Sequence, residues 1–358
     1  MNKKVSVIGT VGLPANYGGW ETLVDHLTKN LSQEIDFEVY CSAKRYSVKL
    51  EDYNGAKLKY VNLDANGAQS IPYDVVSILM SMKSSDTLLI LGVSGCVFLP
   101  ILKLFSKKKV VVNIDGLEWK RAKWGVFAKW FLKVSESIAV RFSDVTVSDN
   151  KAIQDYILSE YGKRSELIAY GADHVKRVGY DDVDIYRYPF LNKSYVFKVC
   201  RIEPENNVHV ILEAFVSITN YDLVIVGNWA NSEYGINLKK LYSSVSHVHL
   251  LDPIYNQDEL NKLRGNCNIY VHGHSAGGTN PSLVEAMFLG LPIIAYAISY
   301  NKETTQGFAK YFSDVVDLKA ILSSIDSVEL SFIADKMKDI ADVNYTWQRV
   351  SDQYRNIF

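Results

Sequence analysis

The residues best suited to chemistry lie in one stretch, His272–Glu285, with the sequence HGHSAGGTNPSLVE. An apolar run, Cys267–Val271, precedes it and predicts a buried strand, and Leu283–Leu289 follows with the spacing of a helix. A strand, a glycine turn and a helix start in this order place unpaired backbone N–H groups at the positive end of a helix. Such a turn binds an anion, most often a phosphate.

Individual residues of this stretch fit that interpretation. Gly277 and Gly278 allow a tight backbone and the close approach of a ligand. Pro281 suits a first helical turn, because its missing N–H would have had no partner there. Glu285 lies one turn further on and is an acceptor for sugar hydroxyls. A glycine turn that only caps a helix is the alternative, and the pattern alone does not decide between the two.

A second candidate follows the predicted strand Tyr195–Cys200, where the sequence RIEPENN begins at Arg201. By the repeated topology described next, this turn should face the same ligand as His272–Glu285. Arg201 could clamp a diphosphate, which needs a permanent cation. A surface arginine paired with Glu203 or Glu205 is the alternative.

The elements that must position these residues repeat along the chain. Val5–Gly9 predicts a strand, Thr10–Gly19 a loop and Trp20–Leu31 a helix, and the same order begins again at Tyr195. Apolar, β-branched runs predict further strands at 37–41, 58–62, 87–91, 110–114, 144–148, 165–169, 223–226, 248–251 and 291–295. This alternation predicts an α/β fold with two Rossmann-like, doubly wound domains facing a central cleft.

The first glycine loop differs from a dinucleotide-binding loop. Gly9, Gly12, Gly18 and Gly19 do not fit the spacing G-x-G-x-x-G, so a dehydrogenase is the least favoured class. We expect Gly18 and Gly19 to face the cleft, because ligands of such sheets lie at the carboxyl ends of the strands. A flexible turn is the alternative for both glycines.

The length of 358 residues favours two domains. We predict an N-terminal domain over 1–173, a linker over 174–193 and a C-terminal domain over 194–334. The final helical stretch, 335–358, could pack back onto the first domain.

Composition excludes several classes of protein. The net charge of −1 implies no general attraction to nucleic acid. The N-terminus enters a strand directly, so no signal peptide is expected, and the longest apolar run, Leu88–Leu102, is too short to span a bilayer. The four cysteines are scattered and predict reduced thiols of a cytoplasmic protein: Cys41, Cys96, Cys200 and Cys267.

One segment has a different character. Between Phe98 and Arg141, including Arg141 itself, ten basic residues stand against three acidic ones, and aromatic residues lie among them. Placed on one helix, the tryptophans and phenylalanines fall on one arc, which predicts contact with an anionic membrane surface. A core helix with a solvated basic face is the alternative. The residues expected at the membrane or acceptor are Trp119, Lys120, Arg121, Trp124, Phe127, Trp130 and Phe131.

Four segments together carry a resemblance to a known family: Gly9–Glu21, Asp115–Trp124, Arg201–Asn207 and His272–Met287. Over nearly its whole length the chain resembles the retaining GT-B glycosyltransferases of family 4, in the bacterial branch of polysaccharide-assembly β-1,4-rhamnosyltransferases. The resemblance implies a nucleotide-sugar donor, dTDP-L-rhamnose, bound mainly by the second domain. It also implies a polyprenyl-diphosphate-linked sugar as acceptor, held by the first domain at the inner face of the plasma membrane.

The resemblance also implies roles for single residues. Arg201 would bind the donor diphosphate, and Glu285 would bond the nucleoside sugar. Gly18 and Gly19 would approach the diphosphate from the first domain. Asp115 is assigned to the acceptor hydroxyl with Glu118 nearby, although Asp115 could equally cap the following helix. The other implied donor-binding residues are Glu203, Asn206, His274, Gly278, Thr279, Asn280 and Ser282.

The sequence departs from the family pattern in three places. Gly277 occupies the first position of the family's paired glutamates, which puts a contact to the donor sugar in doubt. Asn206 stands where the family has a lysine, which removes a phosphate cation; Lys302 and Arg264 are the candidates to replace it. The catalytic histidine of the first domain is also absent.

We expect transfer with retention and without an enzyme-linked sugar, driven by stabilisation of the leaving diphosphate. No cofactor and no divalent metal are expected, because the one DxD-like sequence, Asp182–Asp184, lies in the predicted linker. The alternatives are a transferase that uses a UDP-sugar, a GT-B-fold nucleotide-sugar epimerase and a non-catalytic nucleotide-sugar sensor.

Overall fold

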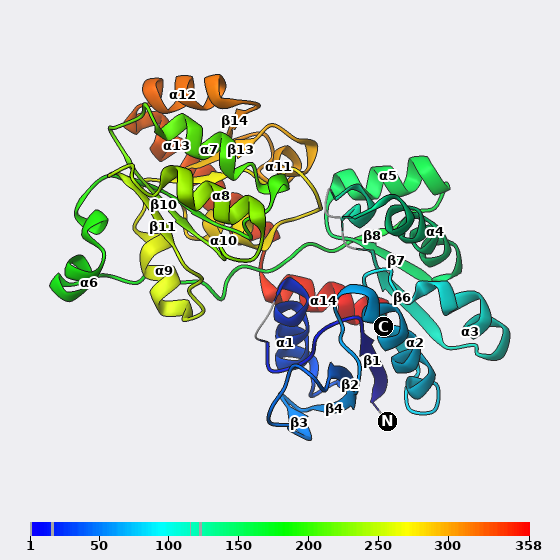
Figure 1. Ribbon diagram of the computed structural model, residues 1–358. Helices are drawn as coiled ribbons and strands as arrows, with labels where there is room; N and C mark the ends of the chain where they lie inside the picture. Colours follow the sequence, from blue (N-terminus) through cyan, green and yellow to red (C-terminus); the bar gives the residue numbers. More distant parts are fainter. Residues whose placement is uncertain (1, 16–17, 115, 122–123) are drawn as a thin grey trace. The chain divides into compact units, whose positions relative to one another are not determined.

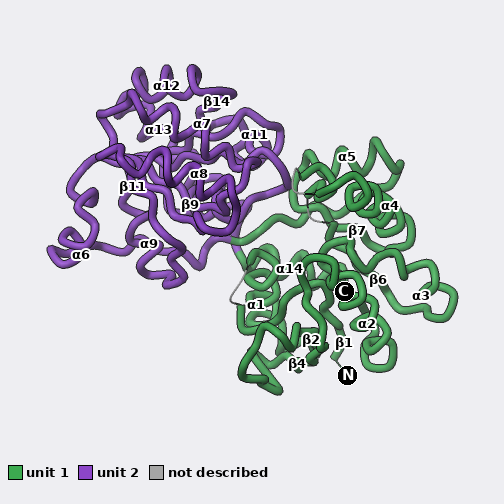
Figure 2. The backbone as a smooth tube through the Cα atoms, in the orientation of Figure 1, with its two compact units in different colours: residues 1–171, 347–358 green, residues 172–346 purple. Residues whose placement is uncertain are grey.

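The computed structural model describes residues 2–15, 18–114, 116–121 and 124–358. The chain divides into two compact units (Figure 2). Unit 1 comprises Met1–Gly171 together with Trp347–Phe358, and unit 2 comprises Ala172–Thr346. The last helix of the chain therefore belongs to the unit that contains its beginning.

Unit 1 is built on a sheet whose strands run parallel except at one edge (Figure 1). The strand order is β3-β4-β2-β1-β5-β6-β7-β8, and only β3 is antiparallel to its neighbour. The central strands β1, β5 and β6 are mainly apolar and, apart from the lysines at the start of β1 and β6, buried, as expected for parallel strands covered by helices. The strands are β1 (Lys3–Ile8), β2 (Ile35–Ser42), β3 (Asp52–Tyr53), β4 (Ala56–Val61), β5 (Thr87–Leu91), β6 (Lys109–Asn113), β7 (Val145–Ser148) and β8 (Glu166–Leu167).

The helices of unit 1 cover this sheet, and the last of them comes from the far end of the chain. Trp347 of α14 stacks on His26 of α1 with ring centroids 4.2 Å apart, and Asn113 Nδ2 donates to the Tyr354 hydroxyl at 2.8 Å. The helices are α1 (Gly19–Leu31), α2 (Ser70–Ser81), α3 (Leu99–Phe105), α4 (Val126–Phe142), α5 (Lys151–Tyr161) and α14 (Trp347–Ile357), with 3₁₀ turns η1 (Gly67–Gln69), η2 (Cys96–Phe98) and η3 (Glu118–Lys120).

Unit 2 has a wholly parallel sheet of order β11-β10-β9-β12-β13-β14. Numbered within the unit, this is the 3-2-1-4-5-6 order of a doubly wound fold, whose ligand site lies where the order reverses. That point falls between β9 and β12. The strands are β9 (Tyr195–Val199), β10 (Asp222–Val226), β11 (Val248–Leu251), β12 (Ile269–His272), β13 (Ile293–Tyr296) and β14 (Lys310–Phe312).

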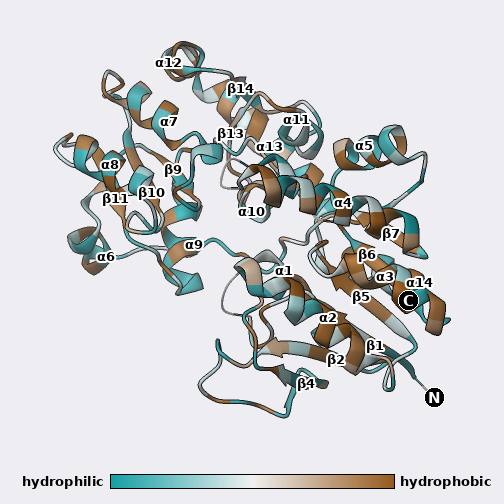
Figure 3. Ribbon diagram, turned by 45° about the vertical axis from the view of Figure 1, so that its right-hand side comes forward, coloured by the Kyte–Doolittle hydropathy of each residue, from teal (hydrophilic) through white to brown (hydrophobic). Residues whose placement is uncertain are grey.

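The core of unit 2 lies between this sheet and its helices, and the apolar strands and helix faces are coloured brown in Figure 3. None of the helices in the described ranges is long and apolar enough to cross a membrane. The helices are α6 (Asp182–Arg187), α7 (Val208–Phe215), α8 (Glu233–Tyr242), α9 (Gln257–Gly265), α10 (Pro281–Phe288), α11 (Ser299–Thr304), α12 (Val315–Ser324) and α13 (Ser327–Asn344), with 3₁₀ turns η4 (Pro189–Asn192) and η5 (Pro204–Asn206).

The predicted α/β fold with two doubly wound sheets is confirmed, but the predicted linker differs from the structure. Residues 174–193 pack within unit 2: Arg177 Nε donates to the Leu289 carbonyl at 3.0 Å, and the buried Phe190 ring meets Tyr195 edge-on. The final stretch is two helices in different units, α13 and α14. Each segment belongs to the unit in which its apolar side chains are buried: Phe190 and Met337 are buried in unit 2, and Tyr354 is buried in unit 1.

Candidate functional site

The turns after β9 and β12 form one hydrogen-bonded structure at the point where the strand order of unit 2 reverses. Ser275 donates through its N–H (2.8 Å) and its hydroxyl (2.9 Å) to the Glu205 carbonyl. Asn207 Nδ2 donates to the Gly273 carbonyl at 2.8 Å, and the His274 Nδ1 and Asn206 Oδ1 atoms lie 3.0 Å apart. The structure therefore brings together the two turns that the sequence identified.

The glycine turn after β12 leads into α10 in the expected way. Asn280 caps the helix, because its Oδ1 accepts from the Ser282 N–H at 3.0 Å and from the Ser282 hydroxyl at 2.8 Å. Pro281 is the first helical residue. Gly277 has a φ of +116°, and Gly278 and Thr279 are buried. A glycine turn before a helix N-terminus is a geometry that can bind an anion, and here the side chain of Asn280 caps the helix.

Arg201 lies directly beyond β9, and about half of its side chain is exposed. Its Nε lies 3.8 Å from Glu203 Oε2, which is a long ion pair between a half-exposed arginine and a mostly buried carboxylate. Such pairs contribute about 0–1 kcal/mol, so a ligand phosphate can displace Glu203. The structure thus contains the ion pair with Glu203 and still leaves the guanidinium accessible.

Glu285 on α10 is held by two cationic or polar partners. Arg264 Nη1 donates to its Oε2, and His174 Nε2 lies 3.3 Å from its Oε1. Burial raises the pKa of Glu285, but the charge of Arg264 and the hydrogen bond from His174 outweigh it and lower the pKa to about 2. Glu285 is therefore ionised at any physiological pH.

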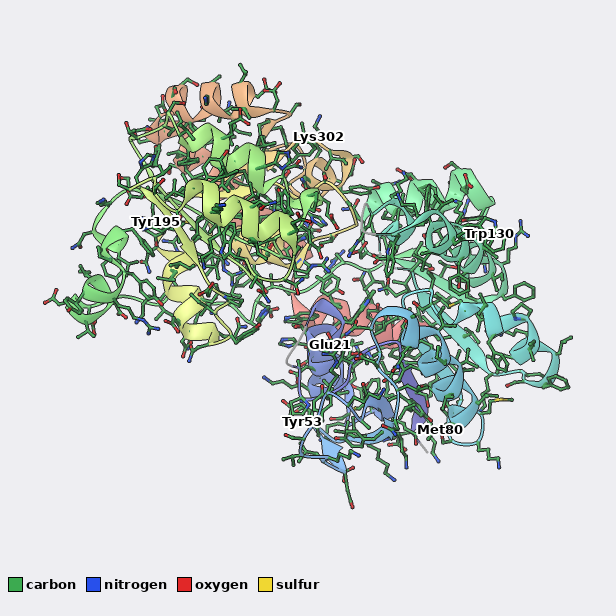
Figure 4. The ribbon with its side chains drawn as sticks, viewed as in Figure 1. Glu21, Tyr53, Met80, Trp130, Tyr195 and Lys302 are labelled. Carbon is green, nitrogen blue, oxygen red and sulfur yellow. The ribbon has the colours of Figure 1, made fainter. Side chains whose placement is uncertain are left out.

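The two bases considered as phosphate cations, Arg264 and Lys302, differ in their surroundings. Arg264 is fully buried, and its Nη2 donates to Asn261 Oδ1 at 2.8 Å. It neutralises Glu285, so it does not replace the lysine lost at Asn206. Lys302 on α11 is exposed (Figure 4), with its Nζ 5.6 Å from the centre of the Tyr311 ring.

Sequence reasoning missed several polar residues of this region. His174 lies in the predicted linker, and Arg264 was considered only as a phosphate cation. Lys198 of β9 and His272 of β12 are buried, and burial lowers the pKa of both side chains. A histidine at the end of a buried strand and a lysine within one are the signals that could have identified the last two.

In unit 1 the two candidate glycines begin the first helix. Gly18 immediately precedes α1 and Gly19 is its first residue. Glu21, labelled in Figure 4, fixes the preceding loop: its Oε1 accepts from the Thr10 hydroxyl and from the Val11 N–H, each at 2.7 Å. A side chain at Gly18 would come within 3.2 Å of the other Glu21 oxygen.

Of the two acidic residues proposed to contact the acceptor, Asp115 lies outside the described residues. Glu118 Oε2 pairs with Arg121 Nε at 2.8 Å, and its Oε1 accepts from the Trp124 indole N–H at 3.3 Å. Glu118 thus organises the turn before α4, and Arg121 is held by that turn.

The basic-aromatic segment is not one helix, which corrects the prediction. Trp119 lies in η3, and its indole N–H donates to the buried Glu136 at 3.1 Å. The ammonium groups of Lys120 and Lys133 lie 5.4 and 4.9 Å from the centre of its ring. The single-helix prediction failed because Gly125 starts α4 after Trp119 and Trp124, which are partly buried, as is Phe131.

The aromatic residues that remain exposed are joined by others from α3. Trp130 on α4, labelled in Figure 4, is 67% exposed and Phe127 is 89% exposed. α3 packs against α4. We call the exposed apolar residues of α3 and of the first two turns of α4 the apolar patch: Ile101, Leu104, Phe105, Val126, Phe127 and Trp130.

Asp184, the second acidic residue of the DxD-like sequence, has a structural role. Asp181 and Asp184 form a reciprocal capping box at the start of α6, and Lys262 Nζ donates to both carboxylate oxygens of Asp184 at 2.6 Å. Within the described residues no cluster of three or more histidine, cysteine or acidic side chains has the geometry to hold a metal ion.

Comparison with known proteins agrees with the geometry of unit 2. Residues 188–341 match the family described as glycosyl transferases group 1, and residues 2–173 match the domain of unknown function DUF1972. The uncharacterized glycosyltransferase MJ1069 of Methanocaldococcus jannaschii is 22% identical, covering 95% of this chain and 94% of that protein. The chain thus carries a glycosyltransferase group 1 domain.

Solved structures show the same fold at low sequence identity. Sucrose-phosphate synthase from Thermosynechococcus elongatus superposes with a TM-score of 0.82 at 13% identity, covering 99% of this chain and 98% of that chain. HepE from Anabaena, solved in complex with UDP-glucose, superposes with a TM-score of 0.76 at 14% identity, with the same coverage. The fold is GT-B, and residues 188–341 form a domain that matches the glycosyl transferases of group 1.

Proposed function

We propose that this glycosyltransferase moves L-rhamnose, with retention, from dTDP-L-rhamnose to a polyprenyl-diphosphate-linked sugar during assembly of a cell-surface polysaccharide. The observation that carries the proposal is the bonded pair of turns after β9 and β12, within the group 1 domain. It puts an accessible arginine and a glycine turn at the ligand end of a doubly wound sheet. The choice of dTDP-L-rhamnose rests on the sequence resemblance.

In the proposed reaction Arg201 and the amides around Gly278 and Thr279 bind the donor diphosphate. The bond between the sugar and the diphosphate breaks, and the negative charge that develops on the phosphate is stabilised by these groups. The departing phosphate takes the proton of the acceptor hydroxyl on the same face of the sugar, and the new glycosidic bond keeps the configuration. The ionised carboxylate of Glu285 accepts a hydrogen bond from a hydroxyl of the nucleoside sugar.

Product analysis tests this proposal directly. Purified protein is incubated with dTDP-L-rhamnose, UDP-glucose or other nucleotide sugars and a lipid-diphosphate monosaccharide, and the products are analysed by mass. We expect a mass increase of one deoxyhexose with dTDP-L-rhamnose. Transfer from UDP-glucose alone would favour the alternative UDP-sugar donor, which the UDP-glucose complex of the similar HepE fold supports. Conversion of a free nucleotide sugar without acceptor would identify an epimerase instead.

The proposed reaction uses no divalent metal, because the arginine and the helix N-terminus supply the positive potential. We expect the transfer rate to be unchanged, within a factor of about two, when EDTA is added to the assay, and magnesium or manganese should not raise it. A rate that falls in EDTA and recovers on adding metal would contradict this prediction.

We further propose that the enzyme is peripheral on the inner face of the plasma membrane and contacts it through the apolar patch. Lys129 lies on α4 and the exposed Lys107 lies directly after α3, and their charges would attract anionic lipids. This differs from the sequence prediction in two ways: Trp119 and Trp124 take part in the fold, and α3 joins the surface.

Replacing Phe127 and Trp130 together by serine is expected to weaken binding to vesicles of anionic lipid by at least about tenfold. Each large apolar side chain contributes about 1.5–3 kcal/mol when it leaves water, and about 1.4 kcal/mol is tenfold in affinity. Co-sedimentation with vesicles measures the effect. The matched control replaces two exposed aromatics of unit 2, Tyr186 and Phe332. Equal losses in both variants, or no loss in either, would show that the apolar patch does not contact lipid.

A further inference from the structure

Unit 1 contains a buried carboxylate that the proposed reaction does not use. Glu136 lies in α4, and only 2% of the residue is exposed. Burying a charged carboxylate is costly unless hydrogen bonds satisfy it. Both oxygens of Glu136 have donors, and these donors lie on different elements of the unit.

The first oxygen of Glu136 is bound to α5. The hydroxyls of Tyr156 and Tyr161 each donate to Oε1 at 2.6 Å, and Lys133 Nζ lies 3.4 Å from the same atom. Burial and the hydrogen bond to Glu136 raise the pKa of both tyrosines, so their hydroxyls remain protonated donors at neutral pH. Oε1 is therefore anchored by α5 and by a lysine of α4 itself.

The second oxygen is bound to the turn after β6. Trp119, in η3, donates its indole N–H to Glu136 Oε2 at 3.1 Å. The ammonium of Lys133 lies 4.9 Å from the centre of the Trp119 ring, and that of the exposed Lys120 lies 5.4 Å from it. Both contacts add cation–π attraction. The ring that Glu136 holds is thus the surface over which Lys120 extends.

The turn held in this way lies at the ligand end of the unit 1 sheet. η3 follows β6, whose carboxyl end lies beside that of β5 because the two strands pair in parallel. Ligands of doubly wound sheets bind at these ends. Ser135, next to Glu136, donates through its hydroxyl to the Val93 carbonyl in the turn after β5. Two adjacent buried residues of α4 therefore fix two neighbouring turns at this end of the sheet.

We infer that Glu136 is a positioning residue for the sugar acceptor: through Trp119 it holds the η3 turn, with the exposed Lys120, in the conformation that binds the acceptor. The inference rests on the proposed function, because it needs an acceptor in unit 1. Glu136 itself neither touches the acceptor nor takes a proton. Loss of its bond to Trp119 should therefore weaken acceptor binding and leave donor binding, which belongs to unit 2, unchanged.

Two variants that each remove one donor to Glu136 test the inference. Trp119→Phe keeps an aromatic ring but removes the donor to Oε2. Tyr161→Phe removes a donor to Oε1, where Tyr156 and Lys133 remain, and leaves the bond to Trp119 intact. Both variants lose one hydrogen bond to the same buried carboxylate, so thermal unfolding should be lowered by similar amounts. A difference between them in acceptor binding then belongs to the turn and not to general stability.

Transfer is measured with dTDP-L-rhamnose and a lipid-diphosphate monosaccharide that has a short, soluble chain, without membranes, so that lipid binding has no part in the result. We expect Trp119→Phe to raise KM for the acceptor about tenfold, the effect of losing one hydrogen bond to a charged group. KM for the donor and kcat should be nearly unchanged. Tyr161→Phe should change none of these values.

Hydrogen exchange gives a readout that does not need the acceptor. The backbone N–H groups of Lys120 and Arg121 close the η3 turn with hydrogen bonds of 2.8 and 3.2 Å. Both should exchange faster in Trp119→Phe and at the wild-type rate in Tyr161→Phe. Mass spectrometry of the peptide that contains the turn measures the rates.

Three results would overturn the inference and leave the proposed function intact: equal changes in acceptor KM in the two variants, an equal rise in donor and acceptor KM in Trp119→Phe, or unchanged exchange in Trp119→Phe. A wild-type protein that transfers no sugar to this acceptor would instead refute the proposed function, and with it the role of Glu136 in acceptor binding.

Discussion

Replacing Arg201 by alanine is expected to lower kcat for sugar transfer by about 10²–10³. Loss of a group that stabilises developing negative charge in an active site has an effect of this size. The guanidinium of Arg201 lies at the ligand end of β9 and is half exposed, and its ion pair within the described residues is the 3.8 Å contact with Glu203. It can therefore move onto a diphosphate at little cost. Steady-state rates at saturating donor measure the effect.

Two further variants show whether the effect belongs to the charge at this position. Arg201→Lys keeps the charge without the bidentate geometry and should fall between the wild type and Arg201→Ala. Arg187→Ala removes another exposed arginine of unit 2, paired with Glu259 at 3.0 Å, and should leave kcat unchanged. Thermal unfolding should be nearly the same in all of these proteins, because the residues are at the surface. Near-normal transfer by Arg201→Ala would remove Arg201 from the mechanism.

Much of the fold was predictable because its signals are local. The strands of a parallel sheet are short apolar runs, and those beginning at Thr87, Tyr195 and Val248 were placed within one or two residues of their bounds. The repeated order of strand, loop and helix predicted that the two turns face the same ligand, and in the structure they are neighbours because β9 and β12 pair in the sheet. The order of strand, turn and helix along the sequence is sufficient to predict that the two turns face the same ligand.

The failures concern residues whose role depends on distant partners. Trp119 was assigned to a membrane-facing arc, but Glu136, seventeen positions later, accepts its indole N–H. His174 was placed in a linker, although it lies 3.3 Å from Glu285. Helical periodicity cannot detect either contact, because one requires a break at Gly125 and the other requires the segment after β8 to pack on α10.

The same network gives the largest expected effect on stability. Replacing Glu285 by leucine leaves the charge of the fully buried Arg264 without its partner. Breaking a buried ion pair in this way costs about 3–5 kcal/mol of folding free energy. Denaturant unfolding of the wild type and of Glu285→Leu measures the difference. A loss of less than about 1 kcal/mol in the free energy of unfolding would show that the buried charge of Arg264 does not need Glu285 as its partner.

The double variant Glu285→Leu with Arg264→Met is the matched control. Replacing both members of a buried pair by apolar residues of similar size is often neutral or stabilising, so we expect most of the lost stability to return. If Glu285 also bonds the nucleoside sugar, the double variant should still bind dTDP more weakly than the wild type. Recovery of both stability and dTDP affinity would limit Glu285 to a structural role.

The pH dependence of stability gives an independent check on the same pair. The pKa of Glu285 is lowered from 4.5 to about 2 in the folded protein. A group whose pKa is lower when folded contributes stability that is fully present above its unfolded pKa and is lost as the pH falls towards its folded pKa. The wild type should therefore lose stability relative to the double variant as the pH falls from about 4.5 to about 2. A difference that stays constant over this interval would mean that Glu285 is not ionised against Arg264 in the native state.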